Sequence, residues 1–125
     1  MFSASQLLEM QEELHRLQAS SPDIEATVLI TMDGLMLTST LPDASDEDRV
    51  SAMSASLLAL AERISLDLGR GLLEQVFLRG ADGDVLLMAV ADKAVLGILS
   101  RREAKLGMLI YYMRRAAKEL ANFLD

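Results

Sequence analysis

The chain has 125 residues, of which 51% are hydrophobic, so it can form one domain with an ordinary core and leaves little room for two. We therefore expect a single domain over residues 1–125. The net charge of −7 argues against nucleic acid or anionic lipid as the main partner. The absence of cysteine excludes disulfides and thiolate metal sites and is compatible with a cytoplasmic protein. No apolar run is long enough to cross a bilayer and no signal peptide is recognisable, so membrane insertion is not expected.

The charge is distributed unevenly along the chain. Residues 1–48 hold ten acids and one base, a net charge of −9, whereas residues 101–125 hold six bases and three acids, a net charge of +3. This asymmetry either orients a charged partner or reflects two solvated helix faces of opposite sign, and the sequence leaves both interpretations open.

The beginning of the chain predicts an amphipathic helix. Ser3 or Ser5 can cap a helix that runs to about Ala19, with leucines and a methionine on one side and acids on the other. Pro22 and the residues around it then end the helix.

A hairpin is predicted next. The β-branched residues over 24–31 indicate a strand, and the pair Asp33-Gly34 supplies the positive φ angles of a tight hairpin turn. A return strand is expected over 35–40, followed by a short connection through Pro42.

The stretch from Ser45 to Leu68 is predicted to be the central helix, because Ser45 can cap it and Gly69 can end it. Its apolar residues lie on two opposite faces. The face expected to pack on the sheet comprises Val50, Met53, Leu57, Leu60, Ala61, Ile64 and Leu68. The opposite face is lined mostly by small side chains, so a second helix could approach it closely.

Three strands are predicted after the glycines, over 73–79, 85–91 and 94–99. A second Asp-Gly pair separates the first two strands. The middle run is apolar at nearly every position, so we expect it to be buried on both faces.

The last helix is predicted to begin at Ser100, because Glu103 follows three residues later as in a capping box. One arc of this helix is apolar. The outward arc fits either a partner surface or an ordinary exposed face, and it holds Met108, Tyr111, Arg114, Arg115 and Lys118. The whole order is helix, two strands, helix, three strands, helix. Because the sheet needs helices on both sides, we expect an α/β three-layer α-β-α sandwich.

Signatures of catalysis or cofactor binding are missing from the sequence. The glycines at 69 and 71 lack the third glycine and the Gly-Lys-Ser/Thr of phosphate-binding loops. His15 is the sole histidine, so a histidine triad or metal site has no second member. The aspartates near the turns of the three-strand segment match no calcium loop. We therefore expect no enzyme active site, no cofactor and no metal.

The residues do match the pattern of one family. A strand, an Asp-Gly-Leu turn and a return strand over residues 28–39, with the sequence VLITMDGLMLTS, precede a helix rich in serine and alanine. Together with the order of the other elements, this pattern resembles the roadblock / dynein light-chain family, in its bacterial small-GTPase regulator type, over nearly the whole chain. The resemblance implies a five-stranded antiparallel sheet of order 2-1-5-4-3, with the central helix on one face and both terminal helices on the other.

Members of this family dimerise by pairing their third strands and packing their central helices together. The resemblance therefore implies a homodimer or a higher oligomer. The expected dimer interface comprises Ala52, Ala55, Ser56, Ala59, Arg63, Leu66, Val76, Phe77 and Leu78. We expect Ala55→Arg or Ala59→Glu to separate the subunits, because an unpaired buried charge is costly.

The resemblance also implies a function, because this family regulates Ras-like small GTPases or serves as a scaffold in motor and signalling complexes. We expect a non-enzymatic regulator or adaptor that binds a Ras-like small GTPase and modulates its GTP hydrolysis or its localisation. The alternative is a structural scaffold subunit with no effect on hydrolysis. Arg63 and Arg70 could act as arginine fingers, but ion pairs with Glu62 or Asp67, or plain solvation, explain them better. The partner is expected first on the central helices and second on the Tyr111 and Arg115 face.

Overall fold

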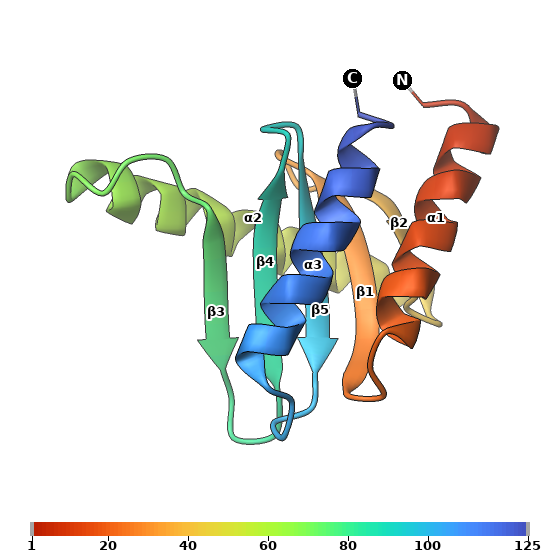
Figure 1. Cartoon of the computed structure of the whole chain (residues 1–125). Helices are drawn as coiled ribbons and strands as arrows, with labels where there is room; N and C mark the ends of the chain where they lie inside the picture. Colours follow the sequence, from red (N-terminus) through yellow and green to blue (C-terminus); the bar gives the residue numbers. More distant parts are fainter. Residues whose placement is uncertain (1, 125) are drawn as a thin grey trace.

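A computed structural model describes residues 2–124, and its eight elements follow the expected order (Figure 1). They are α1 (Ala4–Ala19), β1 (Ile24–Thr31), β2 (Met36–Ser39), α2 (Ala44–Asp67), β3 (Gln75–Arg79), β4 (Asp84–Val90), β5 (Ala94–Ser100) and α3 (Leu106–Ala121). Every strand boundary lies within two residues of its predicted position.

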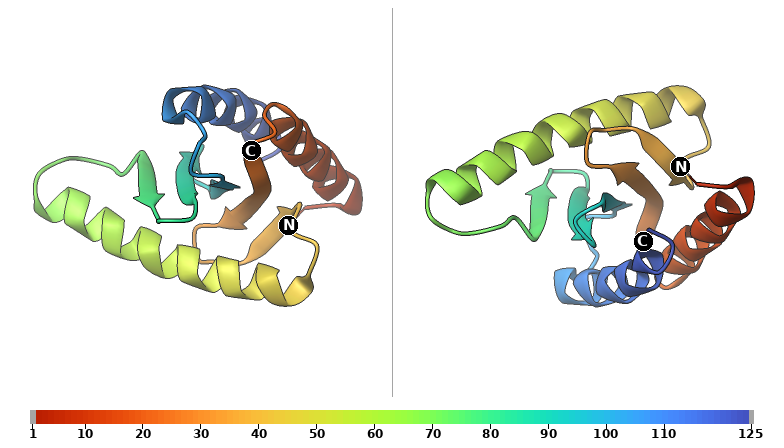
Figure 2. Two further views of the ribbon diagram at one scale, coloured as in Figure 1. Left: turned by 90° about the horizontal axis from the view of Figure 1, so that it is seen from below. Right: turned by 90° about the horizontal axis from the view of Figure 1, so that it is seen from above.

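The five strands form one antiparallel sheet of order β2-β1-β5-β4-β3, as the resemblance implied. In the two end-on views of Figure 2, α1 and α3 lie on one face of the sheet and α2 crosses the other face. The predicted three-layer sandwich is therefore confirmed. The order places β3 at one edge of the sheet, next to β4 only.

The sheet separates two hydrophobic cores of unequal size. The larger core lies under α1 and α3 and contains fully buried side chains such as Met10, Leu96 and Met113. The smaller core lies under α2 and centres on Val28, Ile30, Leu58, Leu87 and Val95. The strand β5 contributes to both cores, because its alternate side chains point to opposite faces.

The helix α2 begins earlier than predicted. Asp43 is its N-cap, with a carboxylate oxygen accepting a hydrogen bond from the Ser45 N–H at 3.0 Å, so the predicted capping by Ser45 is wrong. Gly69 and Gly71 have φ angles of 68° and 85°, which confirms that glycines end the helix. The far half of α2 extends past β3, beyond the edge of the sheet (Figure 2).

The predicted sheet-facing side of α2 is largely wrong. The buried residues of α2 are Ser51, Ser54 and Leu58, which form a narrow stripe of mostly small side chains. Four members of the predicted core face are exposed: Met53, Leu60, Ile64 and Leu68 have exposed fractions of 58%, 58%, 51% and 66%. The far half of α2 extends beyond β3, where no other helix or strand of residues 2–124 covers it (Figure 2).

The start of α3 also differs from the prediction. Ser100 ends β5 and pairs across the sheet with both Asp84 and Ile24. The helix begins five residues further on, after Lys105, whose side chain makes no capping hydrogen bond. Pairing within the sheet thus overrides the local capping signature.

Candidate protein interface

Exposed apolar side chains lie along α2 and on β3. Met53, Leu60, Ile64 and Leu68 of α2 are exposed, and Leu78 of β3 is 45% exposed and shares a groove with Met53. Leu72, in the connection between the two elements, is 76% exposed. A patch of this kind on a small protein is typical of a protein–protein contact.

The same surface contains a groove between α2 and the sheet. Its volume is about 220 Å³, and its lining is almost wholly apolar, comprising Val50, Met53, Ser54, Leu57, Leu78, Val85, Leu87 and Leu99. At its beginning α2 contacts β2, and its far half extends past the edge strand β3 (Figure 2). A second apolar element could fill this groove.

The edge strand β3 divides its side chains between the two faces of the sheet. Val76 and Leu78 pair with Leu87 and Val85, and all four border the core under α2 and its groove. Phe77 pairs with Leu86, which belongs to the core under α1 and α3, so Phe77 lies on the opposite face. The outer edge of β3 has no neighbouring strand within residues 2–124, and an open edge of this kind is a template for pairing.

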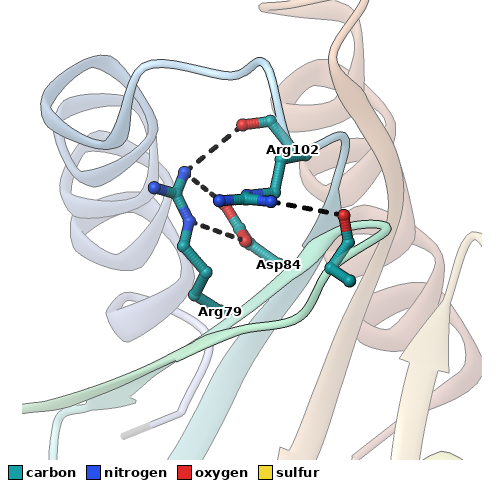
Figure 3. Close-up of polar contacts among 4 residues, drawn as sticks. Arg79, Asp84 and Arg102 are labelled. Carbon is teal, nitrogen blue, oxygen red and sulfur yellow. Dashed lines mark hydrogen bonds and ion pairs between the residues drawn. The ribbon is translucent and has the colours of Figure 1, made fainter.

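A polar cluster fixes the end of β3 (Figure 3). The Arg79 guanidinium donates to both carboxylate oxygens of Asp84 at 3.4 Å, and the Asp84 side chain is only 2% exposed. Arg79 also donates to the Arg102 carbonyl at 3.3 Å, and Arg102 donates to the Ala81 carbonyl at 3.4 Å. The cluster ties the hairpin of β3 and β4 to the segment that leads into α3.

The small-residue face of α2 was predicted as the dimer contact. It and the exposed apolar face lie on opposite sides of the buried stripe of Ser51, Ser54 and Leu58. Ala52, Ser56, Ala59 and Leu66 are exposed there. Ala55 is half-buried against the turn between β1 and β2, where a Cβ placed on Gly34 would lie 2.6 Å from the Ala55 Cβ.

Arg63 is also exposed and faces Asp67 at 3.5 Å, one of the ion pairs expected for it. Of the predicted interface residues, Val76 and Leu78 therefore adjoin the apolar groove, and the small-residue face does not.

The outward arc of α3 is exposed as predicted, at Met108, Tyr111, Arg114, Arg115 and Lys118. The Arg115 guanidinium lies 5.8 Å and 5.7 Å from the ring centroids of Tyr111 and Tyr112. It also donates to the Ser20 hydroxyl at 3.1 Å, so Arg115 fastens α3 to the end of α1. A partner that bound this face would therefore contact mainly Tyr111, Arg114 and Lys118.

The acidic and histidine side chains of the described residues do not gather into a metal-binding cluster. No three histidine, aspartate or glutamate side chains of residues 2–124 lie close enough to share a metal ion, and His15 is exposed. A hydrogen bond and ion pair with Glu13, whose oxygen lies 2.8 Å away, raise the pKa of the Arg16 guanidinium. Hydrogen bonds from Ser45 lower the pKa of the Asp43 carboxyl. Both pKa shifts arise from contacts within a helix or at its N-cap, in α1 for Arg16 and in α2 for Asp43.

Across residues 2–124, no helix combines the length and the apolarity needed to cross a membrane.

The periodicity of α2 predicts Met53, Leu60, Ile64 and Leu68 in the core, whereas the structure exposes all four at the surface. The sequence contains one signal for this exposure. Ser51 and Ser54 lie between the two apolar flanks of α2, and small side chains let a helix lie close to a sheet, so this narrow side could have been predicted to face the sheet. Leu72 carried no periodic signal, because it stands between two elements.

Comparison with known proteins agrees with this architecture. The sequence profile of the Roadblock/LC7 domain matches residues 10–100. An uncharacterized protein of Methanocaldococcus jannaschii, MJ1340, is 33% identical over 97 residues, which cover 78% of this chain and 84% of that protein. The residues that match the profile include all five strands and α2.

Two solved structures share the fold. The Roadblock/LC7 domain from Streptomyces avermitilis has a TM-score of 0.87 and 23% identity, covering 91% of this chain and 96% of that one. Myxococcus xanthus MglB has a TM-score of 0.87 and 17% identity, covering 98% and 91% of the two chains. With the profile match and the 33% identical relative, the chain belongs to the Roadblock/LC7 family.

Proposed function

We propose that this chain is a non-enzymatic, homodimeric regulator or adaptor that works in the cytoplasm, where it binds a Ras-like small GTPase and modulates its hydrolysis of GTP or its localisation. The apolar surface on α2 and β3 carries the proposal, because a small protein exposes a surface of this size and composition for a protein partner. Membership of the Roadblock/LC7 family supports the choice of partner, since the resemblance to this family implies a Ras-like small GTPase.

The homodimer follows from the same surface. Pairing of two β3 strands about a two-fold axis would cover both open edges and extend the sheet to ten strands. The overhanging half of each α2 would then lie over the sheet of the partner. Leu60 and Ile64 of one protomer would fill the groove beside Met53 and Leu78 of the other. This arrangement buries the large apolar flank of α2 and leaves the Ala52 and Ala59 flank outward.

The effect on a GTPase is proposed to come from binding, without a catalytic residue supplied by this chain. Arg63 is 80% exposed and faces Asp67, as expected for an ordinary surface arginine. Such a protein can change hydrolysis by holding the GTPase's own residues in an active arrangement, or can change only its location.

The direct experiment measures phosphate release by a small P-loop GTPase encoded next to this protein, with and without the purified homodimer. We expect a changed hydrolysis rate, or nucleotide-dependent binding without a rate change. The matched variant Ile64→Glu, which should lose the dimer, is expected to lose the effect. Absence of binding in both the GDP and GTP states would refute the proposal.

A scaffold subunit is the second candidate, favoured by the exposed Tyr111, Arg114 and Lys118 on α3, a helix on the face of the sheet opposite α2. Arginine and tyrosine are the residues most enriched at strong protein contacts. Affinity capture with quantitative mass spectrometry separates the two functions. A scaffold should retain partners other than GTPases at stoichiometric amounts, and Tyr111→Ala should release them.

A further inference from the structure

The backbone hydrogen bonds at the two ends of β3 show which residues of this strand face β4. The Gly80 N–H donates to the Gly83 carbonyl at 2.8 Å, and the Ala89 N–H donates to the Glu74 carbonyl at 3.3 Å. Both bonds continue the register in which β3 and β4 pair. Successive residues of a strand direct their backbone groups to opposite sides, so the even-numbered residues over 74–80 are bonded to β4.

The odd-numbered residues Gln75, Phe77 and Arg79 therefore direct their N–H and C=O groups to the outer edge of β3. No strand of residues 2–124 lies along this edge. An added antiparallel strand forms pairs of hydrogen bonds only where its own outward-facing residues meet these three. The pattern therefore restricts the ways in which a second strand can pair with β3.

A second copy of β3 meets this restriction better in one register than in the others. When the two-fold axis passes at Phe77, Phe77 lies opposite Phe77 of the second copy and Gln75 lies opposite Arg79, so all three outward-facing residues pair and form about six hydrogen bonds. When the axis passes at Val76 or Leu78, only two of the three pair within the strand, and about four hydrogen bonds form. Backbone pairing therefore favours the axis at Phe77, and we call this arrangement the Phe77 register.

The side chains favour the same register. Gln75, Phe77 and Arg79 lie on the face of β3 opposite α2. Arg79 is held there by Asp84, and its guanidinium lies 5.7 Å from the Phe77 ring centroid. In the Phe77 register the carboxamide of Gln75 in one copy lies opposite Arg79 of the other copy and can accept a hydrogen bond from its guanidinium. An axis at Leu78 would instead place the two Arg79 residues diagonally, about 7–8 Å apart, where their like charges repel.

We infer that two copies of this chain pair in the Phe77 register, and that Gln75 and Arg79 are the residues that make β3 specific for a second copy of itself. The inference rests on the proposed homodimer and adds the residues that select the partner strand. An edge strand of another protein that carries a cation at the position of Gln75 would meet Arg79 with like charge and be rejected. Specificity thus resides in a residue pair that occurs twice, once on each side of the two-fold axis.

Single cysteines test the register directly, because the chain contains no cysteine of its own. In Phe77→Cys the two substituted residues would lie opposite each other with Cα atoms about 5.5 Å apart, within the range of a disulfide. In Val76→Cys or Leu78→Cys the two copies of the residue would be diagonal neighbours at about 7–8 Å, beyond that range. With diamide as oxidant, Phe77→Cys is expected to form a covalent dimer in non-reducing electrophoresis, and the other two variants are expected to remain uncrosslinked.

A mixture of Val76→Cys and Leu78→Cys covers the case in which loss of the Phe77 ring weakens the dimer. These two positions lie opposite each other in the Phe77 register, with Cα atoms about 4.5 Å apart. The mixture should therefore form a mixed disulfide, identified by its mass, that neither variant forms alone. Cross-linking of Val76→Cys or Leu78→Cys with itself, or absence of the mixed disulfide, would overturn the register.

Substitutions of Gln75 test its contact with Arg79. Gln75→Lys is expected to weaken dimerisation by about tenfold or more in analytical ultracentrifugation, because it places two like-charged pairs across the seam, whereas Gln75→Glu should not weaken it. Asn122→Lys, at the end of α3, makes the same change in charge and should leave dimerisation unchanged. Equal dimer affinity for the two lysine variants would overturn the role of Gln75. Light scattering on the wild type shows which proposal fails: a dimer whose cysteine variants do not cross-link as expected overturns this inference alone, whereas a monomer overturns the homodimer as well.

Discussion

Asp43 sets the beginning of α2 through a hydrogen bond between its carboxylate and the Ser45 N–H. This bond, with a second from the Ser45 side chain, lowers the pKa of the Asp43 carboxyl in the folded protein. An aspartate in the unfolded chain has a pKa of about 3.9. The stabilising contribution of Asp43 is therefore complete above that pH and disappears as the pH falls through the lower pKa of the folded state.

We predict that Asp43→Asn makes the stability less dependent on pH in this acidic window. Asparagine keeps an oxygen that accepts the Ser45 hydrogen bond but carries no titrating proton. Thermal unfolding measured at several pH values should show a smaller decrease in Tm for the variant than for wild type. Asp82→Asn, an exposed aspartate between β3 and β4, is the control. An identical decrease for wild type and Asp43→Asn would contradict the prediction.

Ala91 adopts a left-handed conformation, with a φ angle of 53°, in the tight turn between β4 and β5. Asp92 follows with a φ angle of 57°, and the Lys93 N–H bonds the Val90 carbonyl at 3.0 Å. Two positive φ angles are the geometry of a type I′ hairpin turn, which normally contains asparagine or glycine. Alanine therefore carries strain at this position.

We predict that Ala91→Gly stabilises the protein by about 1 kcal/mol, because glycine adopts a positive φ without steric cost. Ala81→Gly is the matched control in the connection between β3 and β4, where the φ angle is not positive. There the added freedom of the unfolded chain should reduce stability by up to about 1 kcal/mol. Urea unfolding measures both changes. Destabilisation by Ala91→Gly would show that the turn is not strained.

Some single residues could be interpreted correctly from the sequence and others could not. The pair Asp33-Gly34 predicted a turn, and Gly34 has the expected positive φ of 94°, but the positive φ expected for Asp33 is wrong. Ser100 and Glu103 had the spacing of a capping box, yet Ser100 is bound into the sheet by its pairing with Asp84. Local signatures fail where a strand continues through them, because sheet pairing involves residues distant in sequence.

The turn between β1 and β2 packs closely against α2. Gly34 combines its positive φ with a close approach to Ala55, and a Cβ on Gly34 would lie 2.6 Å from the Ala55 Cβ. We predict that Gly34→Ala destabilises the protein by roughly 1–3 kcal/mol, through backbone strain and this steric clash. Chemical denaturation gives the value.

The double variant Gly34→Ala, Ala55→Gly separates the two causes. Removing the Ala55 methyl group relieves the clash and leaves the backbone strain. The double variant should therefore lose less stability than the sum of the losses of the two single variants. Strict additivity of the two free-energy changes would refute the close contact between the turn and α2.

The helix α2 shows why the elements were easier to predict than their orientation. Its length and its two apolar flanks were visible in the sequence, and its bounds differ by one residue at each end from those predicted. Periodicity indicates which residues share a flank but not which flank meets the sheet. The larger flank was assumed to be inside, whereas α2 extends past β3 and leaves Ile64 and Leu68 without a wall. The edge position of β3 in the sheet came from the family resemblance.

For the whole molecule, the proposed function depends on a second copy of the chain. The groove beside α2 and the open edge of β3 lie close together, and the proposed two-fold pairing would cover both of them and the apolar flank of α2. The family resemblance implied the pairing of β3, whereas the helix contact was predicted on the small-residue flank at Ala52, Ala55 and Ala59. The two alternatives differ in which charge would break the dimer.

Multi-angle light scattering of the wild type, Ile64→Glu and Ala59→Glu is the most direct test. Ile64 and Ala59 are both exposed on α2, so each glutamate should be tolerated by the isolated fold. With a chain mass of 13.7 kDa, we predict a wild-type mass of about 27 kDa, an unchanged Ala59→Glu dimer and a monomeric Ile64→Glu, because a glutamate in the filled groove would be buried without a partner. A monomeric wild type, or a dimer that Ala59→Glu breaks and Ile64→Glu does not, would contradict the account.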